Sequence, residues 1–156
     1  MRDHTFAVSV EWTGNAGSGT SGYKDYRRDT RVIAEHKAAI LGSSDKAFHG
    51  DTSRWNPEEL LIAALSQCHL LSFLHVAANA GVVVESYDDD ATGSLAVTAE
   101  GGGNMIEVVL RPRITISRGE VDDVPGLHQR ASELCFIANS VNFPVRHEPV
   151  TVKASQ

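Results

Sequence analysis

Length, composition and charge place this chain among ordinary soluble globular proteins. Its 156 residues suit one compact domain over 1–156, with 42% hydrophobic and 22% charged residues. The formal net charge of −6 argues against a nucleic-acid partner, because phosphates attract a basic surface. No basic stretch followed by an apolar run opens the sequence, so we expect a cytoplasmic protein with reduced thiols.

The first third of the chain predicts strands and loops. Residues 5–12, TFAVSVEW, are rich in β-branched and aromatic side chains and predict a strand. Glycine and serine in 13–22 predict a flexible loop, and a second strand is expected near Arg31. Residues 40–53 suit a loop or a broken hairpin.

A long apolar helix is predicted from about 56 to 80. Asn56 suits the N-cap, Pro57 the first helical position and Glu59 a capping box, whereas Gly81 suits the end. Apolar residues face nearly every direction around the axis, which indicates burial on several sides. Polar residues interrupt the run, so we do not expect a membrane span. Because so small a domain has trouble surrounding this helix, we expect a homodimer about a two-fold axis.

The next part predicts extended segments. Residues 81–99 are read as two extended pieces around an acidic loop, whose YDDD at 87–90 is expected to be solvated. A turn is expected at 101–104, and alternating apolar residues over 106–116 predict one long strand. Pro112 marks an edge or a bend in it.

The last part adds a helix and a strand. Apolar residues at helical spacing predict a helix over 124–143, breaking near Asn139, and 148–154 predicts a final strand. Strands and helices do not alternate regularly, so the expected fold class is α+β.

The chain has two cysteines, Cys68 and Cys135, each in an apolar run. A free cysteine usually packs as a small buried hydrophobe, so inert thiols are one interpretation. The other is a redox pair, because both cysteines lie in segments expected to form the central packing. A thiolate near neutral pH needs a nearby cation, and the segment YRRDTR at 26–31 supplies arginines. The seven histidines show no zinc-binding spacing, so no metal or cofactor is expected.

Two motifs resemble those of the osmotically inducible and organic hydroperoxide resistance (OsmC/Ohr) family. In NPEELLIAALSQC, 56–68, a cysteine follows the first glutamate by ten positions, and LCFIANSVNFPV, 134–145, carries the second cysteine. The resemblance spans most of the chain and is closer to a less-characterised branch. It implies an OsmC-like fold, in which antiparallel sheets wrap around a long central helix in an intertwined homodimer.

The resemblance also implies a thiol-dependent peroxidase that acts on organic hydroperoxides. Cys68 matches the peroxidatic cysteine, Cys135 the resolving cysteine and Glu58 the active-site glutamate. The expected cycle forms a sulfenic acid on Cys68 and then a Cys68–Cys135 disulfide, which a dithiol reductant reopens; the resemblance implies a reductant of the lipoyl type. Ten residues of helix separate Glu58 from Cys68, a rise of roughly 15 Å, so Glu58 is expected to serve the neighbouring subunit.

The family's active-site arginine is assigned to Arg28, with Arg27 and Arg54 as alternates, because the loop around it differs in length from better-known members. Phe136 stands where many members carry proline. Two other functions are weighed: an OsmC-fold binding module for an apolar ligand without peroxidase turnover, and a structural protein that accumulates under stress. The two motifs favour the peroxidase over these two other functions.

Overall fold

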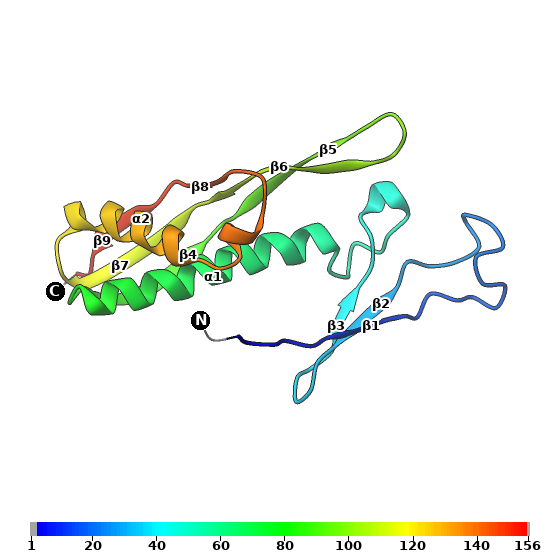
Figure 1. Cartoon of the computed structure of the whole chain (residues 1–156), viewed down its shortest axis with the longest axis horizontal. Helices are drawn as coiled ribbons and strands as arrows, with labels where there is room; N and C mark the ends of the chain where they lie inside the picture. Colours follow the sequence, from blue (N-terminus) through cyan, green and yellow to red (C-terminus); the bar gives the residue numbers. More distant parts are fainter. Residues whose placement is uncertain (1–2, 156) are drawn as a thin grey trace. The chain divides into compact units, whose positions relative to one another are not determined.

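The computed structural model describes residues 3–155, which form two compact units. The first unit extends to Leu60 and the second begins at Leu61 (Figure 1). The elements are a mixture of short strands and two α-helices, so the α+β class is confirmed. That residues 1–156 act as one domain stays a prediction.

The first unit contains a three-stranded antiparallel sheet. Its strands are β1 (Ser9–Trp12), β2 (Thr30–Ile33) and β3 (Ile40–Gly42), in the order β1-β2-β3. The first two confirm the strands predicted there, although β1 takes only the second half of its segment. The short 3-10 helix η1 (Lys46–Phe48) follows β3, so the segment 40–53 contains a strand and then a helical turn, in place of a second hairpin strand.

The long helix α1 (Pro57–Asn79) begins and ends as predicted. At its start, the Glu59 backbone N–H donates to Asn56 Oδ1 at 2.7 Å, and the Asn56 N–H donates to Glu59 Oε2 at 3.1 Å. This reciprocal pair is a complete capping box, which satisfies two backbone donors at the helix start. At the other end, Gly81 has a φ of 73°, a conformation that glycine adopts without strain.

The second unit contains two further three-stranded sheets. One has the order β4 (Val83–Asp89), β7 (Pro112–Arg118), β9 (Val150–Lys153), and the other β5 (Thr92–Val97), β6 (Gly103–Leu110), β8 (Val145–His147). In each sheet the first pair is antiparallel, whereas the last strand runs parallel to its neighbour. The antiparallel pairing expected for these sheets is found in their first two strands, and the parallel third strand makes both sheets mixed.

One long strand was predicted over 106–116, and the structure divides it at Arg111. The Arg111 backbone N–H donates to the side-chain Oδ1 of Asp89 at 2.6 Å instead of to a backbone carbonyl of a neighbouring strand, and Pro112 has no N–H to donate. The chain therefore leaves one sheet after Leu110 and enters the other at Pro112. The bend predicted from Pro112 is confirmed, and the single strand was wrong.

The acidic segment 87–90 is not a solvated loop, and that expectation was wrong. Its first three residues belong to β4, and Asp89 accepts hydrogen bonds from Ser66 Oγ and from the Arg111 backbone. Asp90 pairs with Arg113 Nη1 at 2.6 Å. The carboxylates thus connect α1 and the neighbouring strands.

The second helix, α2 (Val124–Leu134), ends five residues before the predicted break. It follows the 3-10 turn η2 (Val121–Asp123), and a further turn, η3 (Ala138–Ser140), follows it. Cys135 has ψ 105°, which is extended, so the helix cannot continue through it. The final strand predicted at 148–154 is confirmed as β9, whereas β8 was not predicted.

The core of the second unit lies along one stripe of α1, where Leu65, His69, Phe73 and Ala77 recur every four residues. Phe73 packs in a cluster with residues of β7 and α2, and Leu65 in a cluster with residues of β6. By length and composition α1 would be apolar enough to cross a membrane, but this stripe packs against sheets and α2. Within the second unit, apolar residues of α1 outside this stripe are less buried, and Leu71 is 59% exposed.

Candidate functional site with two thiols beside an apolar pocket

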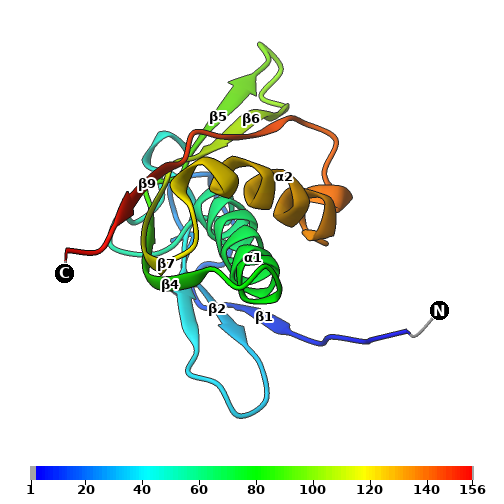
Figure 2. The ribbon, with the colours of Figure 1, turned by 90° about the vertical axis from the view of Figure 1, so that its left-hand side faces the viewer.

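The second unit brings the two cysteines together. Cys68 lies on α1 and Cys135 directly after α2, and both are free thiols. Helix α2 lies alongside α1 in this unit (Figure 2), and the two thiols are close enough to share a hydrogen bond. The two cysteines are therefore 67 positions apart in the sequence but neighbours in the fold.

The two thiols have different environments. Cys135 is fully buried, and this burial raises the pKa of its thiol to about 11. The hydrogen bond with Cys68 contributes to this increase, whereas the Ala138 backbone N–H, which donates to Cys135 Sγ at 3.4 Å, opposes it. Cys135 is therefore a protonated thiol at neutral pH. Cys68 is only half-buried.

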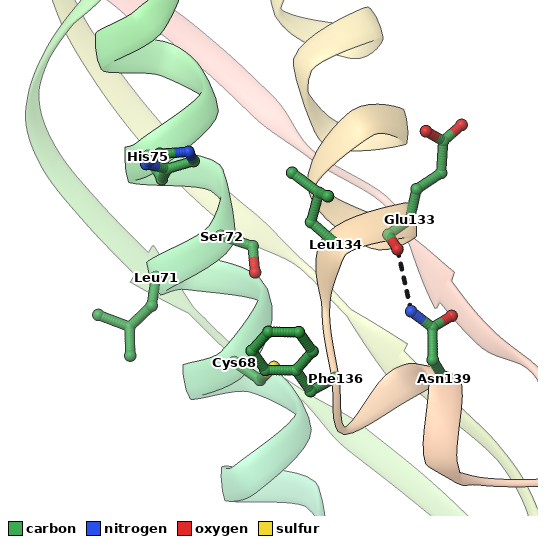
Figure 3. A pocket seen from close by; sticks show the side chains of 8 residues that line it. All are labelled: Cys68, Leu71, Ser72, His75, Glu133, Leu134, Phe136 and Asn139. Atoms are coloured by element: carbon green, nitrogen blue, oxygen red, sulfur yellow. Dashed lines mark hydrogen bonds between the residues drawn. The ribbon is translucent and has the colours of Figure 1, made fainter. Parts of the chain in front are cut away.

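Cys68 lies in the wall of a pocket of about 500 Å³ (Figure 3). The pocket is lined by Cys68, Leu71, Ser72, His75, Glu133, Leu134, Phe136 and Asn139. Apolar side chains supply most of this wall, and Phe136 is 83% exposed. A molecule in the pocket can thus reach Cys68, whereas Cys135 is not part of the lining.

The polar groups of the pocket are held by neighbours. Asn139 Nδ2 donates to the Glu133 backbone oxygen at 2.9 Å, which joins η3 to the end of α2 (Figure 3). The Glu133 carboxylate pairs with Arg130 Nη1 at 2.6 Å, so its charge is balanced locally. His75 Nε2 lies 3.1 Å from Asn79 Nδ2. The lining therefore presents a half-buried thiol among apolar groups and fixed polar ones.

Two other predicted site residues, Arg28 and Glu58, belong to the first unit. The Arg28 guanidinium lies 4.5 Å from the Tyr23 ring centroid and 4.2 Å from that of Tyr26. It also donates to the backbone oxygens of both tyrosines at 2.7 Å. These contacts hold the cation in place. Glu58 lies in the first turn of α1. Their action on Cys68 stays a prediction.

The alternate arginines share one buried carboxylate. Arg54 Nε lies 3.8 Å from Asp29 Oδ1 and 3.6 Å from Asp51 Oδ2, and Arg27 Nε lies 3.3 Å from Asp29 Oδ2. The Asp29 side chain is 9% exposed and that of Arg54 24%. Arg54 is therefore the alternate that is more buried and that lies near two carboxylates.

A buried histidine cluster, made of His69, His128 and His147, was not predicted. The three rings come from α1, α2 and β8 and lie in contact. His69 occupies the buried stripe of α1 between Leu65 and Phe73, which was the available signal. Within residues 3–155, no group of three or more His, Cys, Asp or Glu residues is arranged to hold a metal ion.

Comparisons with known proteins agree with the motifs. The model of the family described as OsmC-like protein matches residues 49–149. A solved OsmC-like protein from Vibrio cholerae is 32% identical, covers 96% of this chain and 100% of its own, and has a TM-score of 0.83. An organic hydroperoxide resistance protein from Elizabethkingia anophelis shares the fold at 17% identity. The match covers 98% of this chain and 100% of that protein's chain, with a TM-score of 0.69.

A curated protein is also similar to this chain in sequence. The YmaD protein of Bacillus subtilis is 23% identical over 145 residues, which cover 90% of this chain and 89% of YmaD. Because the family model spans well over half of the chain, and contains both cysteines, the chain belongs to the OsmC-like protein family.

Proposed function

We propose that this protein is a thiol-dependent peroxidase that reduces organic hydroperoxides to alcohols. The observation that carries the proposal is the pairing of a half-buried Cys68 in a pocket wall with a buried, protonated Cys135. The names of two solved structures with this fold, organic hydroperoxide resistance proteins from Elizabethkingia anophelis and Legionella pneumophila, support it.

The first step takes place at Cys68, which faces the pocket. Its thiolate attacks the peroxide oxygen farther from the organic group, so an S–O bond forms and the O–O bond breaks. The released alkoxide takes a proton and leaves as the alcohol, and Cys68 becomes a sulfenic acid. The apolar wall of Leu71, Leu134 and Phe136 favours an organic hydroperoxide over hydrogen peroxide.

The second step uses Cys135. Its sulfur attacks the Cys68 sulfenic acid, the S–S bond forms and the S–O bond breaks. Because the raised pKa keeps the Cys135 thiol protonated, this thiol supplies the proton that lets hydroxide leave as water. A dithiol reductant of the lipoyl class then reopens the disulfide by exchange and takes up the oxidising equivalents. A reducing, cytoplasmic setting suits this recycling.

The cation and the carboxylate of the site are assigned to Arg28 and Glu58, following the family resemblance. A guanidinium stabilises a thiolate, and a carboxylate holds the guanidinium in position. Because Glu58 lies about 15 Å along α1 from Cys68, we propose that Glu58 of the partner subunit completes each site. The exposed apolar residues Leu71 and Phe136 support a homodimer, in which a second copy covers this face.

Consumption of cumene hydroperoxide with a dithiol reductant tests the proposed function. The wild type is expected to turn over, Cys68→Ser to lose turnover, and Cys135→Ser to oxidise once without forming the internal disulfide. The two serine variants are matched controls, since each removes one sulfur. Thiols that stay free under peroxide, with Cys68→Ser still binding an apolar ligand like the wild type, would instead show a binding module.

A further inference from the structure

The histidine cluster joins the two helices that carry the cysteines. His69 Nε2 and His128 Nδ1 lie 2.9 Å apart and share a hydrogen bond between α1 and α2. The His128 ring also stacks on Phe73, with 4.3 Å between centroids, and His147 lies against the other ring, 4.1 Å from His69. His69 and His128 are 1% and 3% exposed, so these contacts are buried.

Each of the two bonded histidines lies close in sequence to one of the two cysteines. His69 directly follows Cys68 on α1, and His128 precedes Cys135 by seven residues. Seven residues are about two helical turns, so His128 lies on the face of α2 that leads to Cys135. The hydrogen bond and the Phe73 stack therefore fix how α2 sits on α1 beside the thiols.

Disulfide formation is sensitive to that placement. Two cysteines can be bridged only within a narrow range of Cα separations and Cβ directions. Beyond α2, Cys135 is held locally by hydrogen bonds from the Ala138 and Asn139 backbone N–H groups to its Sγ and its carbonyl oxygen. These bonds keep Cys135 in its own segment, whereas the His69–His128 pair ties that segment to Cys68.

We propose that the His69–His128 hydrogen bond is a positioning element that holds Cys135 within bonding reach of Cys68. Its role in turnover rests on the proposed peroxidase function, but its effect on the two thiols does not. Breaking the bond lets α2 shift on α1, which lowers the effective concentration of one thiol at the other.

The bonded atoms define a sharp set of variants. The hydrogen bond uses Nδ1 of His128, and the amide of asparagine occupies a similar position, so His128→Asn retains the bond. His128→Phe retains the ring that stacks on Phe73 and loses the bond. At the other end the bonded atom is Nε2, which glutamine reaches and asparagine does not. His69→Gln and His69→Asn thus form a second matched pair.

The equilibrium between the Cys68–Cys135 disulfide and glutathione tests the proposal in the full-length protein. We expect His128→Phe to lower the equilibrium constant for disulfide formation by about tenfold, and His128→Asn to stay within about threefold of the wild type. Thermal unfolding confirms which variants are folded at the assay temperature. A folded His128→Phe with the wild-type constant overturns the proposal. If His128→Phe does not fold, equal constants for His69→Gln and His69→Asn overturn it.

Single-turnover kinetics separate this proposal from the proposed function. With cumene hydroperoxide, His128→Phe is expected to form the Cys68 sulfenic acid at the wild-type rate and to condense with Cys135 about tenfold more slowly. A wild type that never forms the sulfenic acid contradicts the peroxidase and leaves the glutathione experiment as the test of positioning. Equal condensation rates in both proteins contradict the positioning role.

Discussion

Buried histidines without a carboxylate partner resist protonation. The pKa is lowered to about 3 for His69 and to about 4 for His128, mainly by burial and in part by the neighbouring imidazole of His147. Burial also lowers the pKa of His147, although Asp89 on β4 opposes this. Tyr87 on β4 also stays neutral, because burial raises the pKa of its phenol. The cluster is thus uncharged at neutral pH.

This cluster predicts that the fold is sensitive to acid. Unfolded histidines titrate near 6.5, whereas His69 and His128 in the fold bind protons only near 3 and 4. The unfolded state therefore binds more protons below pH 6.5, and the stability present above that pH is lost as pH falls. The free energy of unfolding should fall by about 1.4 kcal/mol per pH unit for each histidine.

Urea unfolding between about pH 7 and pH 5 measures this effect. His128→Phe removes one of the titrating groups, so its free energy of unfolding should fall less steeply with acid than that of the wild type. Parallel curves for the two proteins would count against a neutral buried His128.

Individual elements were predictable where local chemistry decides them. The bounds of α1 follow from Asn56, Glu59 and Gly81, whose effects act within one helical turn. The bend was predictable from Pro112, but the passage of the chain from one sheet to the other at Arg111 was not, because it depends on Asp89, which lies 22 residues away. The early end of α2 depends likewise on the backbone conformation of Cys135. Local signals therefore located most of the elements, whereas a distant side chain decides where β6 ends and β7 begins.

The capping box gives a prediction for α1. Asn56→Ala should lower the free energy of unfolding by about 1 kcal/mol, because it leaves the Glu59 backbone N–H without its partner. Combining it with Glu59→Ala should cost less than the sum of the two single changes, since both residues belong to one motif. Chemical denaturation measures all three variants, and the exposed Asn142→Ala serves as a control. Fully additive losses would show that the two bonds act independently.

At the scale of the whole molecule, the sequence anticipated the thiol pair but not the histidines beside it. Cys68 and Cys135 stood in two motifs that resemble a family, and the structure brings them together. His69 and His128 carry no such motif, and their contact joins residues 59 positions apart. Pairing of this kind depends on how α2 packs on α1, which sequence periodicity does not specify.

The proposed dimer predicts a dependence of activity on assembly. Light scattering should give twice the chain mass for the wild type. Leu74→Glu places a charge on an open apolar side of α1 and should shift the mass toward the monomer, with loss of peroxidase turnover. Gln129→Glu adds the same charge on the exposed side of α2 and should change neither the mass nor the peroxidase turnover. A folded monomer that is active would contradict the proposal that each site is shared between two subunits.

The parallel strands β8 and β9 also bear on how the polypeptide acquires its fold. Each completes a sheet whose other two strands were laid down earlier, and two strands alone are marginally stable in water. Neither sheet of the second unit can therefore be completed before residues 145–153 are present. Because these pairings close long loops, they slow the search for the native topology. We therefore expect this unit to become resistant to proteases only after residues 145–153 have left the ribosome.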